Sequence, residues 1–453
     1  MYKFSKYKEQ YKLNLQLAIP VVMSQLGNIV VQIVDNAMVG QYGGDDPLPL
    51  AATAFGSSIF MVLFVTAMGL SLGLTPLVGE LYAQGRHGRA AEYLQNGIVL
   101  YSLVGLLIMG VQLATIPLFQ YMGQPAEVIE AATPYYMTLT LGMLPLMIFF
   151  TFKQFLEGLG NTKVAMYCVI ISNVVNVFFN WVFISGNLGA PELGATGAGI
   201  ATLISRVLMA VMLVLYFFKS GEFGDYIIRF ARVNIKRASQ LKLVMMGIPI
   251  SSQIFLEVTA FVITGVMCGW LGTTAITANQ IGMTLGHSAF AIVMSIGVAT
   301  TIRISHCFGR RSIREMRLAS KAAWHLGLAW NVAIAIFFIT LSGVLPKLFS
   351  TNAEVIDLAS TIIIFIVMYQ IPDGVQSISV GILRGMQDVR VIIPIAFISY
   401  WVVAIPVGYL FAFPVDWGPK GLYVGHIFGL STASILMIWR IKWGQNRLLR
   451  GAK

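Results

Sequence analysis

Three carboxylates with apolar neighbours are the residues of this sequence that most clearly could carry chemistry. Asp35, Glu257 and Asp373 lie well inside long apolar stretches, whereas most of the 19 acidic residues lie in or beside polar ones. A carboxylate deep in a membrane is costly unless it is paired, protonated or bound to a cation. Each of the three is therefore a candidate for carrying or binding a cation; the alternative is a carboxyl group that only hydrogen-bonds for packing.

Two of these carboxylates, Glu257 and Asp373, fall in the second half of the chain. Tyr369 precedes Asp373 by one helical turn and can supply a hydroxyl oxygen. Phe290 offers an aromatic face that can help to hold a desolvated cation, or it serves only in packing. Two carboxylates with few fixed positive partners suit a monovalent cation, so we expect Glu257 and Asp373 to be ligands of Na⁺.

The third carboxylate, Asp35, has neutral polar candidates around it. Asn176 and Asn180 are four residues apart and share a helix face, and Tyr136 and Thr202 lie in neighbouring apolar segments. Amides and hydroxyls can hydrogen-bond either form of a carboxyl group, so Asp35 is expected to gain and lose a proton. The alternative for the asparagines is adhesion between membrane helices.

The composition shows what must position these residues. Of 453 residues, 57% are hydrophobic and 11% charged, and the mean hydropathy is +0.78. Soluble domains carry about 25% charged residues, so this chain is a polytopic membrane protein. Twelve apolar segments long enough to cross a bilayer are expected at 14–38, 49–76, 92–116, 131–156, 163–185, 195–218, 240–268, 277–303, 318–343, 356–382, 391–413 and 421–443. They leave no room for a soluble catalytic or nucleotide-binding domain, and their continuous apolar character excludes a β-barrel.

The basic residues predict the topology. Among the 30 Lys and Arg, the odd-numbered breaks between segments hold only Lys347 and Lys420, while the even-numbered breaks and both termini hold nearly all the others. By the positive-inside rule, both termini and the even breaks are cytoplasmic. The net charge of +11 therefore indicates anionic lipid headgroups as the partner, and not nucleic acid.

The two halves of the chain repeat each other. Ile19-Pro20 matches Ile248-Pro249 at an offset of 229 residues, and Gly85 matches Gly309 at 224. We expect an all-α fold with an N-lobe (1–218), a cytoplasmic linker (219–242) and a C-lobe (243–453), the six-helix lobes being related by a pseudo-two-fold axis along the membrane normal. Pro20 interrupts the hydrogen bonding of its helix and is a candidate hinge. Arg206 is expected to be the one buried cation, partnered by carbonyl groups or snorkelling.

Several motifs resemble those of the multidrug and toxic compound extrusion (MATE) family, in particular its NorM-like branch. The similarity rests on Ile-Val-Asp35-Asn-Ala-Met-Val-Gly, Asn180-Trp-Val-Phe, Phe255-Leu-Glu257-Val-Thr and Tyr369-Gln-Ile-Pro-Asp373 with Leu-Arg-Gly385. It covers essentially the whole chain, with the motifs in the expected order.

The resemblance implies an inner-membrane antiporter that exports cationic or amphipathic drugs in exchange for H⁺ or Na⁺. By the same resemblance, Asp35, Asn176, Asn180 and Tyr136 form a proton and drug site in the N-lobe, with bending at Pro20. Glu257, Asp373, Tyr369 and Phe290 form a cation site in the C-lobe. No cofactor is expected beyond the coupling ion, and we expect a monomer.

Two alternatives to drug efflux follow from the same residues. A lipid-linked oligosaccharide or lipid flippase of the same superfamily would need basic residues in its cavity, whereas the deep charges here are chiefly acidic. An intramembrane enzyme would need a nucleophile with a base, or a metal set, and the five histidines show neither HExxH nor GxSxG context. We therefore expect a secondary transporter and not an enzyme.

Overall fold

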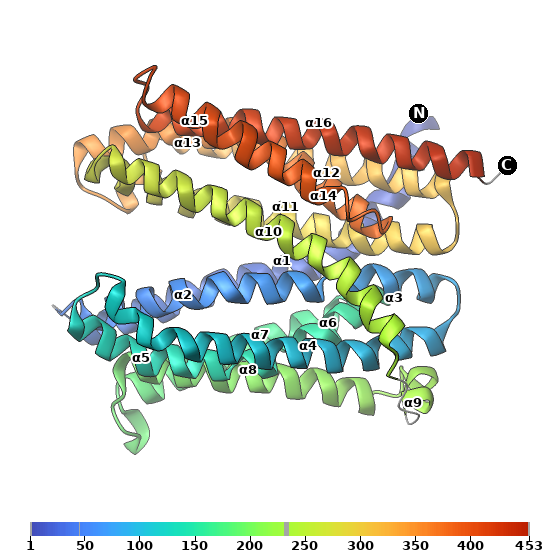
Figure 1. Cartoon of the computed structure of the whole chain (residues 1–453), viewed down its shortest axis with the longest axis horizontal. Coiled ribbons are helices and arrows are strands. Elements are labelled where there is room, and N and C mark those ends of the chain that lie inside the picture. The colour runs from blue at the N-terminus through green and yellow to red at the C-terminus, as the bar shows by residue number, and fades with distance from the viewer. Residues whose placement is uncertain (1, 45, 231–234, 452–453) are drawn as a thin grey trace. The chain divides into compact units, whose positions relative to one another are not determined.

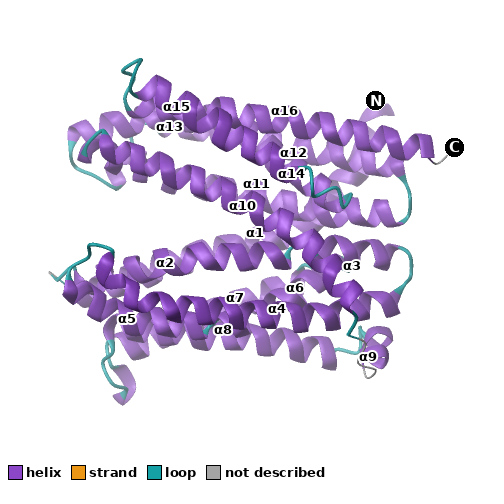
Figure 2. Cartoon of the chain, viewed as in Figure 1, coloured by secondary structure: helices purple, strands orange, loops and turns teal. Residues whose placement is uncertain are grey.

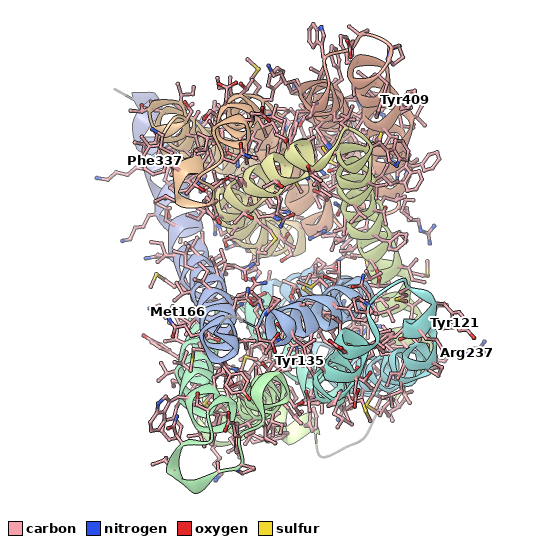
Figure 3. All side chains as sticks on the ribbon, turned by 90° about the vertical axis from the view of Figure 1, so that its left-hand side faces the viewer. Tyr121, Tyr135, Met166, Arg237, Phe337 and Tyr409 are labelled. Carbon is pink, nitrogen blue, oxygen red and sulfur yellow. The ribbon has the colours of Figure 1, made fainter. Side chains whose placement is uncertain are left out.

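The computed structural model describes residues 2–44, 46–230 and 235–451, and within these ranges the regular elements are all helices (Figures 1 and 2). The described residues contain twelve spans, each of one to three consecutive helical elements, that are long and apolar enough to cross a membrane, which confirms the number predicted from the sequence. Their outward faces are apolar: Phe337 and Tyr409, labelled in Figure 3, are 48% and 49% exposed. Such faces are suited to lipid contact.

The chain divides into two compact units, here called the N-unit (Met23–Ser251) and the C-unit (residues up to Val22, with Ser252 onward). The N-unit contains α2 (Leu48–Ser71), α3 (Leu74–Ala83), α4 (His87–Thr115), η1 (Ile116–Tyr121), α5 (Ala126–Leu141), α6 (Met143–Gly158), α7 (Lys163–Ile184), η2 (Asn187–Gly189), α8 (Gly194–Lys219) and α9 (Gly224–Phe230). The C-unit contains α11 (Thr273–Gly309), α12 (Ile313–Leu341), η3 (Leu345–Leu348), α13 (Ala353–Gly385), α14 (Ile392–Ala396), η4 (Phe397–Ala404), α15 (Ile405–Ala412) and α16 (Pro419–Gly451).

Two long helices belong to both units. α1 (Tyr2–Gly43) passes from the C-unit to the N-unit after Val22, and α10 (Arg237–Trp270) passes from the N-unit to the C-unit after Ser251. Each change of unit comes two residues after a proline inside the helix, Pro20 in α1 and Pro249 in α10. The lobe limits expected from the sequence, with a linker at 219–242, stay a prediction, and residues 231–234 of that linker lie outside the described residues.

Packing contacts show the internal repeat directly. In the N-unit, the Thr75 hydroxyl donates to the carbonyl of Gln154 at 3.1 Å, and in the C-unit the Thr301 hydroxyl donates to the carbonyl of Gly381 at 3.1 Å. The two pairs are related by offsets of 226 and 227 residues. The same helix-to-helix contact is therefore built twice, once in each unit.

The turn between the second and third segments of each half refines the alignment. Gly85 adopts a positive φ of 68°, and the residue that adopts a positive φ in the second half is Arg311, at 55°. The offset here is 226 residues, so the expected match of Gly85 with Gly309 was wrong by two positions. Glycine identity misled the alignment, because the second half uses an arginine where the backbone must be left-handed.

The eleventh membrane span contains a π-helix, η4, between α14 and α15. Near its start, Ser172 in the N-unit matches Ser399 at an offset of 227, since each faces α8 or its counterpart α16. After it, Phe183 matches Phe411 at 228, since their backbones face Gly197 and its counterpart in the same way. A π-helix accommodates one inserted residue, which accounts for the increase of the offset from 227 to 228.

Candidate functional site

The N-unit carries a chain of hydrogen bonds that begins at Asp35. The Asn180 side-chain amide donates to Asp35 Oδ1 and also faces Asn176 Oδ1 at 3.0 Å. The Asn176 amide in turn lies 3.5 Å from the Thr202 hydroxyl. The asparagines are buried and Asp35 is partly buried. The structure therefore brings together four of the five residues expected at this site.

Helix geometry explains why these side chains meet. Asn176 and Asn180 are one turn apart on α7, so their amides stack on one face, between Asp35 on α1 and Thr202 on α8. The Thr202 hydroxyl donates to the Ala198 carbonyl at 2.9 Å and so can accept from Asn176. The row presents neutral donors and acceptors to a single carboxyl group, which can be hydrogen-bonded in either protonation state.

Tyr136, the fifth expected residue, lies elsewhere in the N-unit. Its hydroxyl is 3.0 Å from that of Thr115, and its ring packs edge-on against Phe119 at 5.1 Å between centroids. The adjacent Tyr135, labelled in Figure 3, hydrogen-bonds Ser57 at 2.9 Å and lies within electrostatic range of Asp35. The structure thus places Tyr135, rather than Tyr136, toward the Asp35 row.

The C-unit carries a second polar cluster, around Glu257. The Gln253 amide, one turn earlier on α10, donates to Glu257 Oε2, and Arg384 Nη2 donates to Gln253 Oε1 at 2.9 Å. Arg384 also lies within electrostatic range of Glu257. Tyr400, in the π-helix η4, hydrogen-bonds Glu257 and donates to Gln376 Oε1 at 2.9 Å. Tyr400 thus lies in a π-helix, an element that often occurs at functional sites.

Asp373 belongs to the same cluster. It is 5% exposed, lies within electrostatic range of Glu257, and its Oδ1 has no hydrogen-bond partner among the described residues. The backbone around Pro372 is held from two sides, since the Asn331 amide donates to the Gln370 carbonyl at 2.8 Å and the Ser434 hydroxyl to the Pro372 carbonyl at 2.6 Å. The helix is therefore held by neighbouring helices on both sides of Asp373, which keeps an oxygen without a partner.

Tyr369 and Phe290, the other expected residues of this site, behave differently. Tyr369 is buried, within electrostatic range of Asp373, with its hydroxyl directed at the Gly286 position of α11 and its ring 6.3 Å from that of Tyr423. Phe290 is partly exposed on α11 and makes no ring contact with the cluster among the described residues. The structure joins Tyr369 to the carboxylates and leaves Phe290 outside their contacts.

The donor set fits a monovalent cation. A buried carboxylate oxygen without a partner, a second carboxylate and nearby hydroxyls are hard oxygen ligands of the kind that alkali cations take. Among the described residues no group of three or more His, Cys, Asp or Glu side chains gathers as a transition-metal site would require. Glu257 and Asp373 would hold Na⁺, and in its place either carboxylate can take a proton.

Sequence reasoning missed the partners of these carboxylates. Arg384 lies two residues beyond the predicted tenth segment, and Gln253 was available as a polar residue one turn from Glu257. Tyr400 carried no signal, because only the folded structure brings the eleventh span against α10, where the Trp401 indole also donates to the Leu256 carbonyl at 3.3 Å. A buried acid was missed too: Glu157, 1% exposed, pairs with Lys153 at 3.1 Å.

The expectation that Arg206 is the one buried cation was wrong. Arg206 does bond a carbonyl, that of Leu139 at 2.8 Å, and its guanidinium lies 4.6 Å from the centre of the Phe60 ring. Arg206 is only partly buried, whereas Arg303, 8% exposed on α11, is buried and donates to Gln10 Oε1 at 2.8 Å. Its position at the end of the predicted eighth segment suggested solvent, but the folded α1 covers it.

Among the described residues, twelve helices long and apolar enough to cross a membrane, with carboxylates in the interior of each unit, have the pattern of a secondary transporter. The MatE family model matches the chain twice, over residues 20–182 and 249–410. The chain therefore belongs to the MatE family, as the motifs indicated, and it is a multi-pass membrane protein. The two matches begin at the paired prolines Pro20 and Pro249 and so mark the internal repeat.

Relatives extend this result over the full length. The multidrug resistance protein NorM of Vibrio vulnificus strain YJ016 is 31% identical over 443 residues, 97% of this chain and 96% of the relative. An outward-facing structure of a multidrug resistance MATE family transporter of the MOP superfamily matches with a TM-score of 0.87 at 19% identity, covering 97% of each chain. A MOP superfamily transporter from Pyrococcus furiosus, whose binding pocket has reverse polarity, matches at 0.83 and 20% identity, covering 98% of this chain and 97% of its own. These structures share the fold.

Proposed function

We propose that this transporter exports cationic or amphipathic organic compounds across the cytoplasmic membrane in exchange for H⁺, Na⁺ or both, by alternating access. The relatives named as multidrug resistance proteins support the substrate class. The observation that carries the coupling is Asp373, a buried carboxylate with an open oxygen beside Glu257. A cation or a proton must satisfy that oxygen whenever the site is closed to water.

The two clusters have different roles in this proposal. Asp35, with its row of amides and Thr202, gains and loses a proton. That proton and a cationic substrate compete for the Asp35 carboxyl group. Glu257 and Asp373 bind Na⁺ or a proton, with Tyr369 as a hydroxyl donor. Pro20 acts as the hinge of α1, since the helix changes unit two residues later.

The topology and assembly form part of the same proposal. Both termini face the cytoplasm, the membrane is the inner one, and the protein works as a monomer without nucleic acid partners. The distribution of Lys and Arg among the breaks supports the orientation.

A lipid or lipid-linked oligosaccharide flippase is the second candidate within transport. A pyrophosphate-bearing substrate would need uncommitted cations in the cavity. Here the Arg206 side chain bonds the Leu139 carbonyl and Arg384 bonds Gln253, while Asp373 keeps an open oxygen. The polarity weighs toward cationic substrates.

The test is transport of a fluorescent organic cation by the full chain in proteoliposomes, with Na⁺ and proton gradients imposed separately. We expect uptake into inside-out liposomes when either driving ion runs outward, and none without a gradient. Transport unaffected by both gradients would overturn antiport, and the gradient that works identifies the ion. A lipid-linked substrate moved in place of the cation would favour the flippase.

A further inference from the structure

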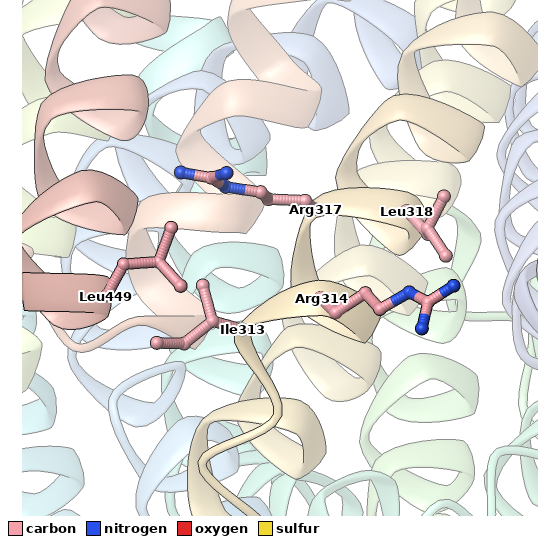
Figure 4. A pocket seen from close by; sticks show the side chains of 5 residues that line it. All are labelled: Ile313, Arg314, Arg317, Leu318 and Leu449. Carbon is pink, nitrogen blue, oxygen red and sulfur yellow. The ribbon is translucent and has the colours of Figure 1, made fainter. Parts of the chain in front are cut away.

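Two hollows open side by side in the C-unit, where the start of α12 meets the end of α16. The first, of about 260 Å³, is lined by Ile313, Arg314, Arg317, Leu318 and Leu449 (Figure 4). The second, of about 270 Å³, is also lined by Arg317 and includes Lys321, Trp324, Lys442 and Asn446. Arg317 belongs to both, and its Nη2 donates to Asn446 Oδ1 at 2.5 Å. The two hollows form one groove.

The groove lies at the ends of two predicted apolar runs, where lipid headgroups are expected. The predicted apolar run of α12 begins at Leu318, and that of α16 ends at Trp443. Residues just outside these limits face the boundary between hydrocarbon and water, on the side that carries most of the basic residues. Trp443 marks the same boundary, since its ring lies 4.3 Å from the Arg440 guanidinium and 5.5 Å from that of Arg447.

The residues that line the groove are basic or apolar, as expected for a site that binds an anionic lipid. Arg314, Arg317, Lys321 and Lys442 line the two hollows, and no acidic residue does. The nearest acid in sequence, Glu315, faces Arg310 at 3.5 Å. Arginine side chains match phosphate oxygens with paired donors.

The apolar part of the groove adds what a soluble anion does not need. Ile313 and Leu449 lie next to each other beside Arg317, and Leu318 lies near Arg314 on another face of α12 (Figure 4). Trp324 and Ile441 extend the apolar wall in the second hollow. Glycerol and the first methylenes of an acyl chain would bury this surface.

We propose that this groove binds the headgroup of an anionic phospholipid from the cytoplasmic leaflet. Four cations over two adjoining hollows suit a lipid with two phosphates, one on each side of Arg317, better than a lipid with one. Basic pockets between membrane helices on this side bind such headgroups. A bound lipid would hold the ends of α12 and α16 together.

The experiment measures thermal unfolding of the purified full chain in neutral detergent, with added cardiolipin, phosphatidylglycerol or phosphatidylcholine. We expect a melting temperature that rises with cardiolipin concentration, rises less with phosphatidylglycerol and does not respond to phosphatidylcholine. The Arg314→Gln/Lys321→Gln variant should lose most of the cardiolipin shift. Arg86→Gln, which removes one exposed arginine from the α3–α4 turn of the N-unit, should retain it.

Two further arms make the result decisive. Arg317→Gln also removes the bond to Asn446, so its shift is compared with its own lipid-free melting temperature. Inorganic pyrophosphate replaces lipid in a parallel series. Equal shifts in wild type and both groove variants, or equal shifts from phosphatidylcholine and cardiolipin, would overturn the proposal. A full shift from pyrophosphate alone would make the groove a site for soluble anions and would overturn it as well.

Discussion

The two units place their carboxylates at different positions of the same repeated scaffold. Asp35 in the N-unit corresponds to Thr264 in the C-unit, and Thr202 to His426, by the offsets of the repeat. In the N-unit two amides link Asp35 to Thr202, whereas in the C-unit Thr264 bonds His426 directly at 2.8 Å. The position that holds an acid in one unit is a neutral contact in the other.

A second equivalent position shows the reverse. Asn28 in the N-unit faces Asn173 at 3.5 Å, while the corresponding residues of the C-unit are Glu257 and Tyr400, which bond each other. Each helix that begins a repeat, α1 or α10, thus has two polar positions two turns apart. In each unit only one of these positions holds an acidic residue. Duplication supplied a symmetric frame, and the choice of position separated the proposed proton site from the proposed cation site.

The largest expected effect comes from removing the N-unit carboxylate. Asp35→Asn keeps the volume and a hydrogen bond to Asn180 but cannot carry a proton, so export should fall about tenfold or more with the protein still folded and inserted. Efflux of a fluorescent cation from cells with matched expression measures this. Asp46→Asn makes the same change in the loop before α2 and should export normally; wild-type export by Asp35→Asn would make this residue structural.

The C-unit carboxylates should respond to Na⁺. Binding at 100 times the dissociation constant stabilises a protein by about 2.7 kcal/mol, so the melting temperature of the wild type should rise with NaCl at ionic strength held constant with choline. The Glu257→Gln/Asp373→Asn variant should not respond. Since protons compete for the same oxygens, the rise should shrink as the pH falls. A double variant that responds like the wild type would show that Na⁺ binds elsewhere.

Arg384 is a fixed positive charge near the proposed cation site and should weaken Na⁺ binding. At an effective dielectric of about 20, a unit charge roughly 8–16 Å away contributes roughly 1–2 kcal/mol, so Arg384→Gln should tighten Na⁺ binding about fivefold to thirtyfold at high pH. Titration of the melting temperature with NaCl gives the comparison. The residue at the same place in the N-unit is Glu157, and Glu157→Gln is the matched control, with Na⁺ affinity unchanged. Weaker binding in Arg384→Gln would mean that this arginine organises the site through Gln253.

The neutral contact of the C-unit should matter for stability more than for transport. Thr264→Val leaves the buried Nε2 of His426 without its partner, which costs about 1–3 kcal/mol and lowers the melting temperature. Export per folded molecule should stay within about twofold. Thr202→Val, at the position equivalent to His426, should reduce export more than it lowers the melting temperature. A large transport defect in Thr264→Val at unchanged stability would place His426 in the transport path.

The smallest effects concern the repeated turn. Arg311 adopts a left-handed backbone conformation without the freedom of glycine. Arg311→Gly should therefore increase the free energy of unfolding by at most about 1 kcal/mol and raise the melting temperature. Gly85→Ala, at the equivalent position, should lower it by a similar amount. Both are measured by thermal unfolding in detergent. Changes of the same sign in the two variants would reject the 226-residue alignment of these turns.

How far the sequence predicts this molecule depends on the kind of signal. The twelve spans followed from composition, and the meeting of Asp35 with Asn180 followed from motif and helix spacing, because both depend on local pattern. The placement of Tyr136 failed, since two adjacent tyrosines face different neighbours and only the rotation of α5 decides which one approaches Asp35. Arg384 and Glu157 were missed because helices extend past the ends of their apolar runs and bury charge there.

The π-helix at Phe397–Ala404 has a consequence for how the two halves could diverge. An inserted residue in a regular helix would rotate everything downstream by about 100° and misplace its contacts. Here the widened turn takes up the extra residue, so Phe411 still meets α16 as Phe183 meets α8. A duplicated gene could thus change length inside a membrane helix without losing its packing on either side of the inserted residue. The two copies could therefore diverge in length as well as in the side chains at equivalent positions.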